Sequence, residues 1–166
     1  MNKTLAITLA LGLGLLTACD KAQQPQETTA TEQATFATVV WMDDFAKAKA
    51  ESAALKRPIF AYFTGSDWCD WCVKLKSEVL DTEPFAKFAA ENLVLFEADF
   101  PRKKELSEKV KSQNDDLAGW YRVRGYPTLF LLNAEGKILV ETGYLEGGAE
   151  AYVTHLKELL SKVNAK

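Results

Sequence analysis

The order of apolar and polar residues divides the chain into segments typical of strands and segments typical of helices. Apolar runs bounded by Gly, Pro or polar turns indicate strands, and runs that do not alternate with polar residues suit strands buried on both faces. We expect strands at residues 36–41, 58–65, 93–100, 128–133 and 137–145.

The segments between these runs have helical spacing. In the first, Asp43 or Asp44 is a candidate N-cap. Pro84 falls near a helix start, where proline is tolerated. The last segment carries apolar residues on one face, which is typical of an amphipathic closing helix. The predicted helices cover residues 42–57, 69–81, 83–92, 102–112 (followed by a turn at 113–116) and 149–163.

This succession predicts the fold class. Strands separated by helices indicate parallel pairs, whereas the last two strands, joined by a tight turn at residues 134–136, indicate a hairpin. The chain is therefore expected to be an α/β protein with a central mixed sheet flanked by helices.

The N-terminal segment has the pattern of a secretory signal. Lys3 precedes the apolar run Leu5–Leu16, which is shorter than the roughly 20 residues that span a bilayer. The sequence that ends at Cys19 resembles a bacterial lipobox, in which the signal is cut before the cysteine and lipid is attached to it. Asp20 resembles the signal that keeps such proteins in the inner membrane of enteric bacteria. The alternatives are an ordinary signal peptide cut nearby or a buried N-terminal helix.

The segment after Cys19 is expected to be a tether. Residues 20–35 lack aromatic and large aliphatic side chains and cannot bury enough surface to become ordered. A flexible segment of this length spans an r.m.s. distance of roughly 20–25 Å. We therefore predict a lipoprotein signal peptide at 1–18, a flexible tether at 19–35 and a folded domain at 36–166.

The charge and the cysteine content of the chain limit the kinds of partner that it can bind. The 166 residues carry a formal charge of −3 without an extended basic run, so there is no electrostatic case for nucleic acid. Export to an oxidising compartment allows disulfides to persist. With Cys19 lipidated, Cys69 and Cys72 can pair only with each other or with a partner protein.

The stretch GSDWCDWCVKL, with Cys69 and Cys72 three positions apart, is compatible with a metal site, a structural crosslink or a redox centre. A tetrahedral zinc site needs four ligands, and the single histidine, His155, lies far away in the sequence. Cu(I) binding to the two thiols is a weaker alternative, since no Met or His cluster supports it. A purely structural disulfide would close a very small loop, so it would stabilise the protein little by reducing the entropy of the unfolded chain. We expect no metal and no cofactor.

A buried strand that runs into Trp68-Cys69-Asp70-Trp71-Cys72, followed later by Gly125-Tyr126-Pro127-Thr128 before a strand, resembles the thioredoxin-like superfamily. The first motif is similar to that of exported bacterial members with a second tryptophan between the cysteines. The resemblance implies a thioredoxin fold over the 36–166 domain.

The same resemblance implies a thiol–disulfide oxidoreductase on the periplasmic side of the cell envelope, acting on protein thiols and disulfides as a reductant or isomerase. It also implies a membrane electron-donor protein as a partner. The alternative from another class is a non-enzymatic adaptor that uses the fold for binding.

Cys69 is the candidate attacking thiol. It stands at a helix start, where orphan N–H groups and the helix dipole favour a thiolate. Cys72, one turn deeper and more buried, would resolve the mixed disulfide. Residues i and i+3 of a first helical turn share a face, so their Cα atoms can meet the window of roughly 4.4–6.8 Å for a disulfide.

Neighbouring aromatic residues are candidate supports of the site. Trp68 is expected to pack partly exposed beside the thiol. Trp71 either belongs to the core or presents an apolar surface to substrates. The resemblance implies that Pro127 is cis and packs against the disulfide, and that the backbone of Tyr126 pairs with substrate. The alternative is a trans proline that starts an edge strand.

The chain departs from the thioredoxin pattern at the buried aspartate, where only Ala61 or Tyr62 is available. The partner lysine is replaced by Leu95 or a neighbour, so Glu97, Asp99 or water is left to accept the Cys72 proton. A longer connection at residues 101–116 is either a solvated helix or a partner surface.

The remaining expectations concern charge and core. Asp67 and Asp70 are predicted to be solvated and to disfavour a Cys69 thiolate, since no cation lies within residues 67–72. This argues for a potential nearer to about −270 mV than to about −120 mV. Trp41 and Trp120 are assigned to the core, and His155 to the surface or its boundary.

Overall fold

The computed structural model describes residues 39–164. The predicted signal peptide, the lipidation of Cys19, the role of Asp20 and the tether lie outside the described residues. The elements are β1 (Trp41–Met42), α1 (Phe45–Leu55), β2 (Ile59–Thr64), α2 (Asp70–Leu75), the π-helical turn η1 (Lys76–Leu80), α3 (Glu83–Asn92), β3 (Val94–Asp99), α4 (Glu108–Trp120), β4 (Thr128–Leu132), β5 (Ile138–Thr142) and α5 (Gly148–Asn164).

The strands form one five-stranded mixed sheet in the order β1-β3-β2-β4-β5. The strands β1 and β2 pair with β3 in parallel, and β4 and β5 form the expected antiparallel hairpin. The strand β4 also runs antiparallel to β2. This pairing differs from the parallel one expected for strands that a helix connects, since α4 lies between β3 and β4 in the chain. The predicted α/β class with a mixed sheet is confirmed.

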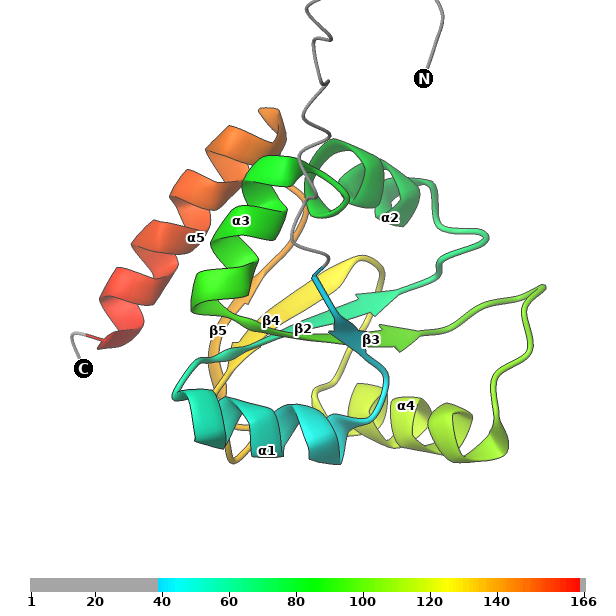
Figure 1. Ribbon diagram of the computed structural model, residues 1–166. Helices are drawn as coiled ribbons and strands as arrows, with labels where there is room; N and C mark the ends of the chain where they lie inside the picture. Colours follow the sequence, from blue (N-terminus) through cyan, green and yellow to red (C-terminus); the bar gives the residue numbers. More distant parts are fainter. Residues whose placement is uncertain (1–38, 165–166) are drawn as a thin grey trace, which may run out of the picture. The chain divides into compact units, whose positions relative to one another are not determined.

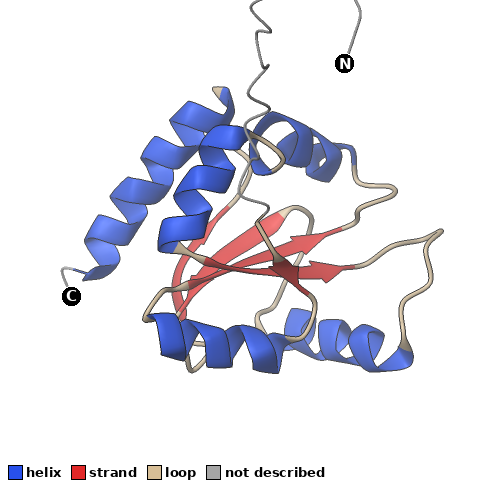
Figure 2. Cartoon of the chain, in the orientation of Figure 1, coloured by secondary structure: helices blue, strands red, loops and turns tan. Residues whose placement is uncertain are grey.

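Helices cover both faces of the sheet, as Figures 1 and 2 show. One apolar cluster lies between the sheet and α2, η1, α3 and α5, and it includes both cysteines. A second cluster lies on the opposite face beneath α1 and α4. The strand β2 is buried along its whole length, which agrees with its uninterrupted apolar sequence. Within residues 39–164, no helix is both long and apolar enough to cross a membrane.

The sheet brings three distant parts of the chain to one edge. Thr64 at the end of β2 pairs with Asp99 at the end of β3, and Thr128 at the start of β4 pairs with Phe63. After β3, a loop, α4 and the segment at residues 121–127 lead the chain to β4, which starts at the edge where β3 ends and runs in the opposite direction (Figure 1). The segments after β2, after β3 and before β4 therefore meet.

Three sequence predictions about α4 are wrong. The helix that was expected to begin at residue 102 begins at Glu108, so the basic residues before it form a loop. Residues 113–116 are helical rather than a turn. Tertiary contacts hold these polar residues in the helix: the Gln113 side chain accepts from Phe45 N (2.8 Å), and the buried Asn114 amide donates to the Asp99 carbonyl (2.9 Å). Trp120, assigned to the core, is 82% exposed because Leu117 and Ala118 form the side of α4 that packs on the sheet.

The sequence also assigned Trp41 to the core and His155 to the surface or its boundary. Trp41 is partly buried against the first cluster, where its ring stacks on Phe85 with centroids 6.4 Å apart. His155 lies at the boundary as predicted, with its Nε2 atom 3.0 Å from the Thr142 hydroxyl.

Candidate redox site

Cys69 and Cys72 form a disulfide at the start of α2, with Cα atoms 5.2 Å apart. Cys69 is the N-cap residue, and its Sγ atom accepts from the backbone N–H of Cys72 at 3.2 Å. A sulfur in this position faces the positive end of the helix dipole, which stabilises a thiolate. Cys69 is 7% exposed and Cys72 is 1% exposed, so Cys72 is the more buried, as expected.

A tight turn at Gly65 presents the cysteine pair. The Gly65 carbonyl accepts from Trp68 N (3.2 Å) and Cys69 N (2.9 Å), which folds the chain back as it leaves β2. A Cβ atom at Gly65 would overlap the Trp68 ring. The close approach of the indole therefore requires glycine at this position.

Gly65→Ala is expected to destabilise the protein by roughly 1–3 kcal/mol, because the new methyl group displaces the Trp68 ring. Denaturant titration measures the loss, and near-ultraviolet circular dichroism reports the tryptophan environment. Gly119→Ala in α4 is the matched control, since a Cβ atom there meets nothing within 4 Å. Equal stability of the two variants would contradict the steric explanation.

Trp68 connects the cysteines to the two other segments at this edge. Its Nε1–H donates to the Phe100 carbonyl at 2.7 Å, and its ring meets the Tyr126 ring edge-on with centroids 5.7 Å apart. Phe100 also contacts Tyr126, with centroids 5.2 Å apart. The Tyr126–Pro127 peptide bond is cis, which confirms the predicted isomer. Trp68 is half-buried, as expected.

Asp67 is bound rather than freely solvated, which corrects the sequence prediction. Its carboxylate accepts from the backbone N–H groups of Arg102 (2.9 Å), Lys103 (2.7 Å) and Lys104 (3.1 Å). These hydrogen bonds, with Arg102 contributing most, hold the pKa of the Asp67 carboxyl below its usual range. The Arg102 guanidinium also lies over the Trp68 ring, 3.9 Å from its centroid. A cation therefore sits beside the residue that precedes Cys69.

A buried carboxylate supports the same turn. Asp99, only 7% exposed, accepts from the backbone N–H (2.9 Å) and the hydroxyl (2.6 Å) of Ser66. Both carboxylate oxygens are thus engaged in fixing the chain between β2 and the cysteines. Sequence reasoning considered Asp99 only as a proton acceptor and missed this role.

Tyr62, one of the two candidates for the position of the thioredoxin-like aspartate, is buried and contacts Cys72. Its hydroxyl donates to the Cys72 carbonyl (3.1 Å) and accepts from the Thr64 hydroxyl (2.8 Å). Burial raises the pKa of Tyr62 to about 12, so the hydroxyl stays protonated. Glu97 pairs with Tyr62 in the sheet register and lies on the same face, and burial raises the pKa of its carboxyl.

Trp71 belongs to the surface rather than the core, with 55% of its area exposed. Its ring packs against Tyr144 with centroids 5.4 Å apart, and Lys74 Nζ lies 5.1 and 5.2 Å from the two ring centroids. The Tyr144 hydroxyl donates to Glu78 at 2.7 Å. These contacts hold an aromatic surface next to the cysteines. Tyr144 gave no sequence signal, because it follows β5 and reaches Trp71 only through the fold.

In residues 39–164, no group of three or more His, Cys, Asp or Glu side chains is arranged to hold a metal ion. Cys69 and Cys72 offer the chemistry of a dithiol. A sulfur at a helix start, with a second sulfur one turn deeper, suits exchange between a dithiol and a disulfide.

Comparison with known proteins agrees with this geometry. The sequence model of the family described as "Thioredoxin-like domain" matches residues 45–159. The disulfide bond reductase DsbH of Chlamydia pneumoniae is 39% identical over 124 residues, which cover 75% of this chain and 74% of the relative.

Solved structures show the same fold. The structure titled DsbH Oxidoreductase superposes with a TM-score of 0.74 at 36% identity, covering 83% of this chain and 95% of that one. A thioredoxin from Thermus thermophilus superposes with a TM-score of 0.55 at 21% identity, covering 76% and 91%. The second likeness shows the fold alone.

Proposed function

The chain belongs to the thioredoxin-like domain family and is a thiol–disulfide oxidoreductase, and we propose that it reduces or isomerises disulfides of proteins in the cell envelope. The observation that carries the proposal is the disulfide between Cys69, at the N-cap of α2, and Cys72, one turn deeper. We assign attack to Cys69 and resolution to Cys72.

The proposed reaction is a two-step exchange. The Cys69 thiolate attacks one sulfur of a substrate disulfide, forms a mixed disulfide and releases the other sulfur as a thiolate. Cys72 then loses its proton, attacks Cys69 Sγ and releases the second substrate thiolate. Two electrons pass to the substrate, and the Cys69–Cys72 disulfide remains. A membrane protein with a reduced dithiol would restore the starting state by the same exchange in reverse.

We propose Glu97 as the group that accepts the Cys72 proton. It lies on the sheet face that carries the cysteine cluster, and burial raises the pKa of its carboxyl, which makes its carboxylate a stronger base. Both oxygens of Asp99 already accept from Ser66. Tyr62 donates its hydroxyl proton to a backbone carbonyl.

Substrate contact is proposed for four aromatic or proline positions around the disulfide. Trp71 presents an exposed indole, and Trp68 and Tyr126 contact each other beside Cys69. The cis peptide places Pro127 directly before β4, where the backbone of Tyr126 is available to an extended segment. We infer these roles from the likeness of this chain to the family.

The reducing direction rests on the similarity to a protein named disulfide bond reductase. The two carboxylates near Cys69 repel its thiolate less than the sequence suggests. Asp67 is hydrogen-bonded to backbone N–H groups, and the Arg102 cation lies beside Trp68. Asp70 alone remains as an exposed carboxylate next to Cys69.

Equilibration of the protein against glutathione buffers tests the direction. We expect a reduction potential near the thioredoxin value of about −270 mV, because a reductant needs a disulfide that is hard to reduce. The fraction of oxidised protein is read by alkylation of free thiols and mass measurement. A potential more positive than about −170 mV would identify an oxidant and contradict the proposal.

We place the domain on the periplasmic side of the cell envelope, anchored by lipid on Cys19 and retained at the inner membrane through Asp20. The lipobox-like sequence before Cys19 and the low-complexity segment after it support this location. A tether of this composition lets the domain reach partners near the membrane.

A further inference from the structure

We propose that the loop at residues 100–106, here called the basic loop, recognises acidic segments of the protein substrate beside Cys69. This inference rests on the proposed function, because it names the kind of protein on which the redox site acts. The basic loop contains three consecutive cations, Arg102, Lys103 and Lys104.

The basic loop is attached to the redox site by its contacts with Asp67 and Trp68. Asp67, two residues before Cys69, accepts three of its backbone N–H groups at 2.7 to 3.1 Å. Trp68 donates to the Phe100 carbonyl at 2.7 Å, and Arg102 covers the same indole. The loop position is therefore set by the two residues that lead into the cysteine pair.

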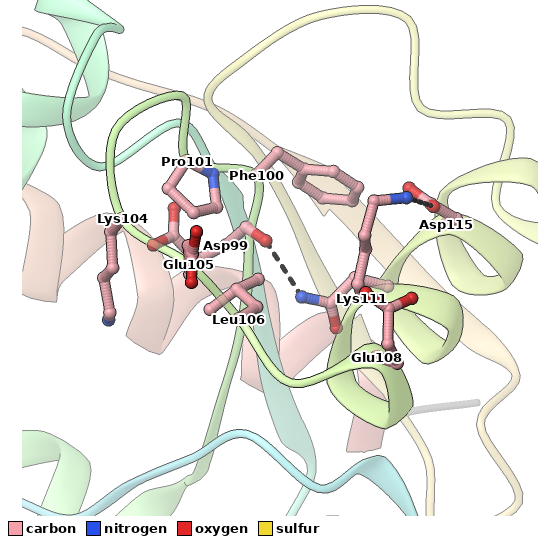
Figure 3. A pocket seen from close by; sticks show the side chains of 10 residues that line it. Asp99, Phe100, Pro101, Lys104, Glu105, Leu106, Glu108, Lys111 and Asp115 are labelled. Atoms are coloured by element: carbon pink, nitrogen blue, oxygen red, sulfur yellow. Dashed lines mark hydrogen bonds and ion pairs between the residues drawn. The ribbon is translucent and has the colours of Figure 1, made fainter.

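The other side of the basic loop borders a hollow next to α4. The hollow has a volume of about 440 Å³, and Figure 3 shows Leu106 and Glu108 lining this space. On the far wall Lys111 is paired with Asp115 at 2.8 Å (Figure 3). The contacts with Asp67 and Trp68 fix the side of the loop that faces the redox site.

The charges of the basic loop are available to a partner. Arg102, Lys103 and Lys104 are exposed, and no salt bridge within residues 39–164 involves them. Asp67 interacts with the loop through backbone N–H groups, which leaves the side-chain cations unneutralised by direct pairing. Glu105, also exposed, is the acidic residue that follows in the loop. On a chain with a net charge of −3, this is a local positive surface.

An acidic polypeptide fits this surface better than an anionic membrane does. Phe100 contacts Tyr126, so the loop borders the residue whose backbone precedes the cis proline and lies next to the cysteine pair. A peptide segment bound at Lys103 and Lys104 would continue past Tyr126 to the thiol. Under the proposed function the neighbouring redox site takes protein substrates, so a polypeptide is the occupant expected beside it. Charges at the rim of a site act mainly on association rate and are screened by salt.

The test uses three peptides that share one internal disulfide and differ only in flanking residues: Glu, Lys or Ser. The reduced full chain should consume the Glu peptide with a kcat/KM about 3- to 10-fold higher than the Lys peptide at low ionic strength. Added salt should diminish this ratio. The ratio should fall to one or invert in the double variant Lys103→Glu/Lys104→Glu, which keeps Arg102 on Trp68.

The matched control is Lys137→Glu/Lys162→Glu, which makes the same change in charge at the opposite end of the sheet and should keep the wild-type ratio. Equal rates on the Glu and Lys peptides in the wild type, or an unchanged ratio in the loop variant, would overturn the proposal. Binding to phosphatidylcholine vesicles with and without phosphatidylserine is measured in parallel. Vesicle binding that is lost in the loop variant, with an unchanged peptide ratio, would assign the loop to the membrane instead.

Titration of disulfide-free versions of the peptides separates this inference from the proposed function. Preferential binding of the Glu peptide without turnover of any peptide would support the role of the basic loop and reject the proposed reduction of protein disulfides. Turnover of all three peptides at one rate, with equal binding, would support the proposed function and reject the role of the basic loop.

Discussion

Cys69→Ser is expected to reduce disulfide exchange to the uncatalysed rate, because it removes the sulfur that attacks the substrate. Serine at the N-cap still accepts a backbone hydrogen bond, so the start of α2 should be preserved. The Cys72 thiol that remains is 1% exposed and cannot reach a protein disulfide without local opening. Rates are measured with a protein disulfide substrate and a reductant that cycles the enzyme.

Cys72→Ser is the matched variant, since it also leaves one thiol and one hydroxyl. It should still attack but not resolve, so mixed disulfides with substrates should accumulate on Cys69. Non-reducing electrophoresis after exposure to substrate reveals these species, and mass spectrometry identifies what is bound. Equal trapping by the two variants would show that the roles of attack and resolution are wrongly assigned.

Cys19→Ala is expected to release the protein from the membrane fraction completely. Each buried methylene of an acyl chain contributes about 0.8 kcal/mol, and one chain alone binds only marginally. A lipobox cysteine carries lipid on both its sulfur and its new amino group, so its removal eliminates every chain at once. Fractionation of cells that express each form measures the partition, and intact mass detects the lipid.

The control for this loss is Asp20→Ala, which leaves the lipidated cysteine and should keep the protein on a membrane. A wild-type protein with a free N-terminus and no lipid mass would exclude the anchor, while the chemistry of the dithiol would stand.

The order of elements was predictable from the sequence because the strand runs are apolar and the breaks between them are clear. The run of β2 has no polar position before Thr64, and the helix-start position of Cys69 follows from the turn at Gly65. The cis Tyr126–Pro127 bond was predicted from family likeness, not from the residues themselves.

The sequence did not predict contacts between distant segments, because these depend on where the sheet edge brings each chain end. Asp67 and Arg102 are far apart in the chain, yet a carboxylate of one accepts from the backbone of the other. The exposed Trp120 was misassigned because aromatic residues are usually buried, and only its side of α4 determines its exposure. Both errors concern tertiary placement rather than local pattern.

The attachment of the basic loop to Asp67 by backbone N–H groups has an evolutionary consequence. A main-chain contact does not depend on which side chain its residue carries, so residues 103 and 104 are free to vary in charge while the backbone contacts to Asp67 and the Arg102 side chain on Trp68 keep the loop in place. Mutational drift at these positions would retune partner choice without altering Cys69 or Cys72. Exchanging the side chains of this loop between relatives is thus a way to change which protein substrates the same pair of cysteines acts on.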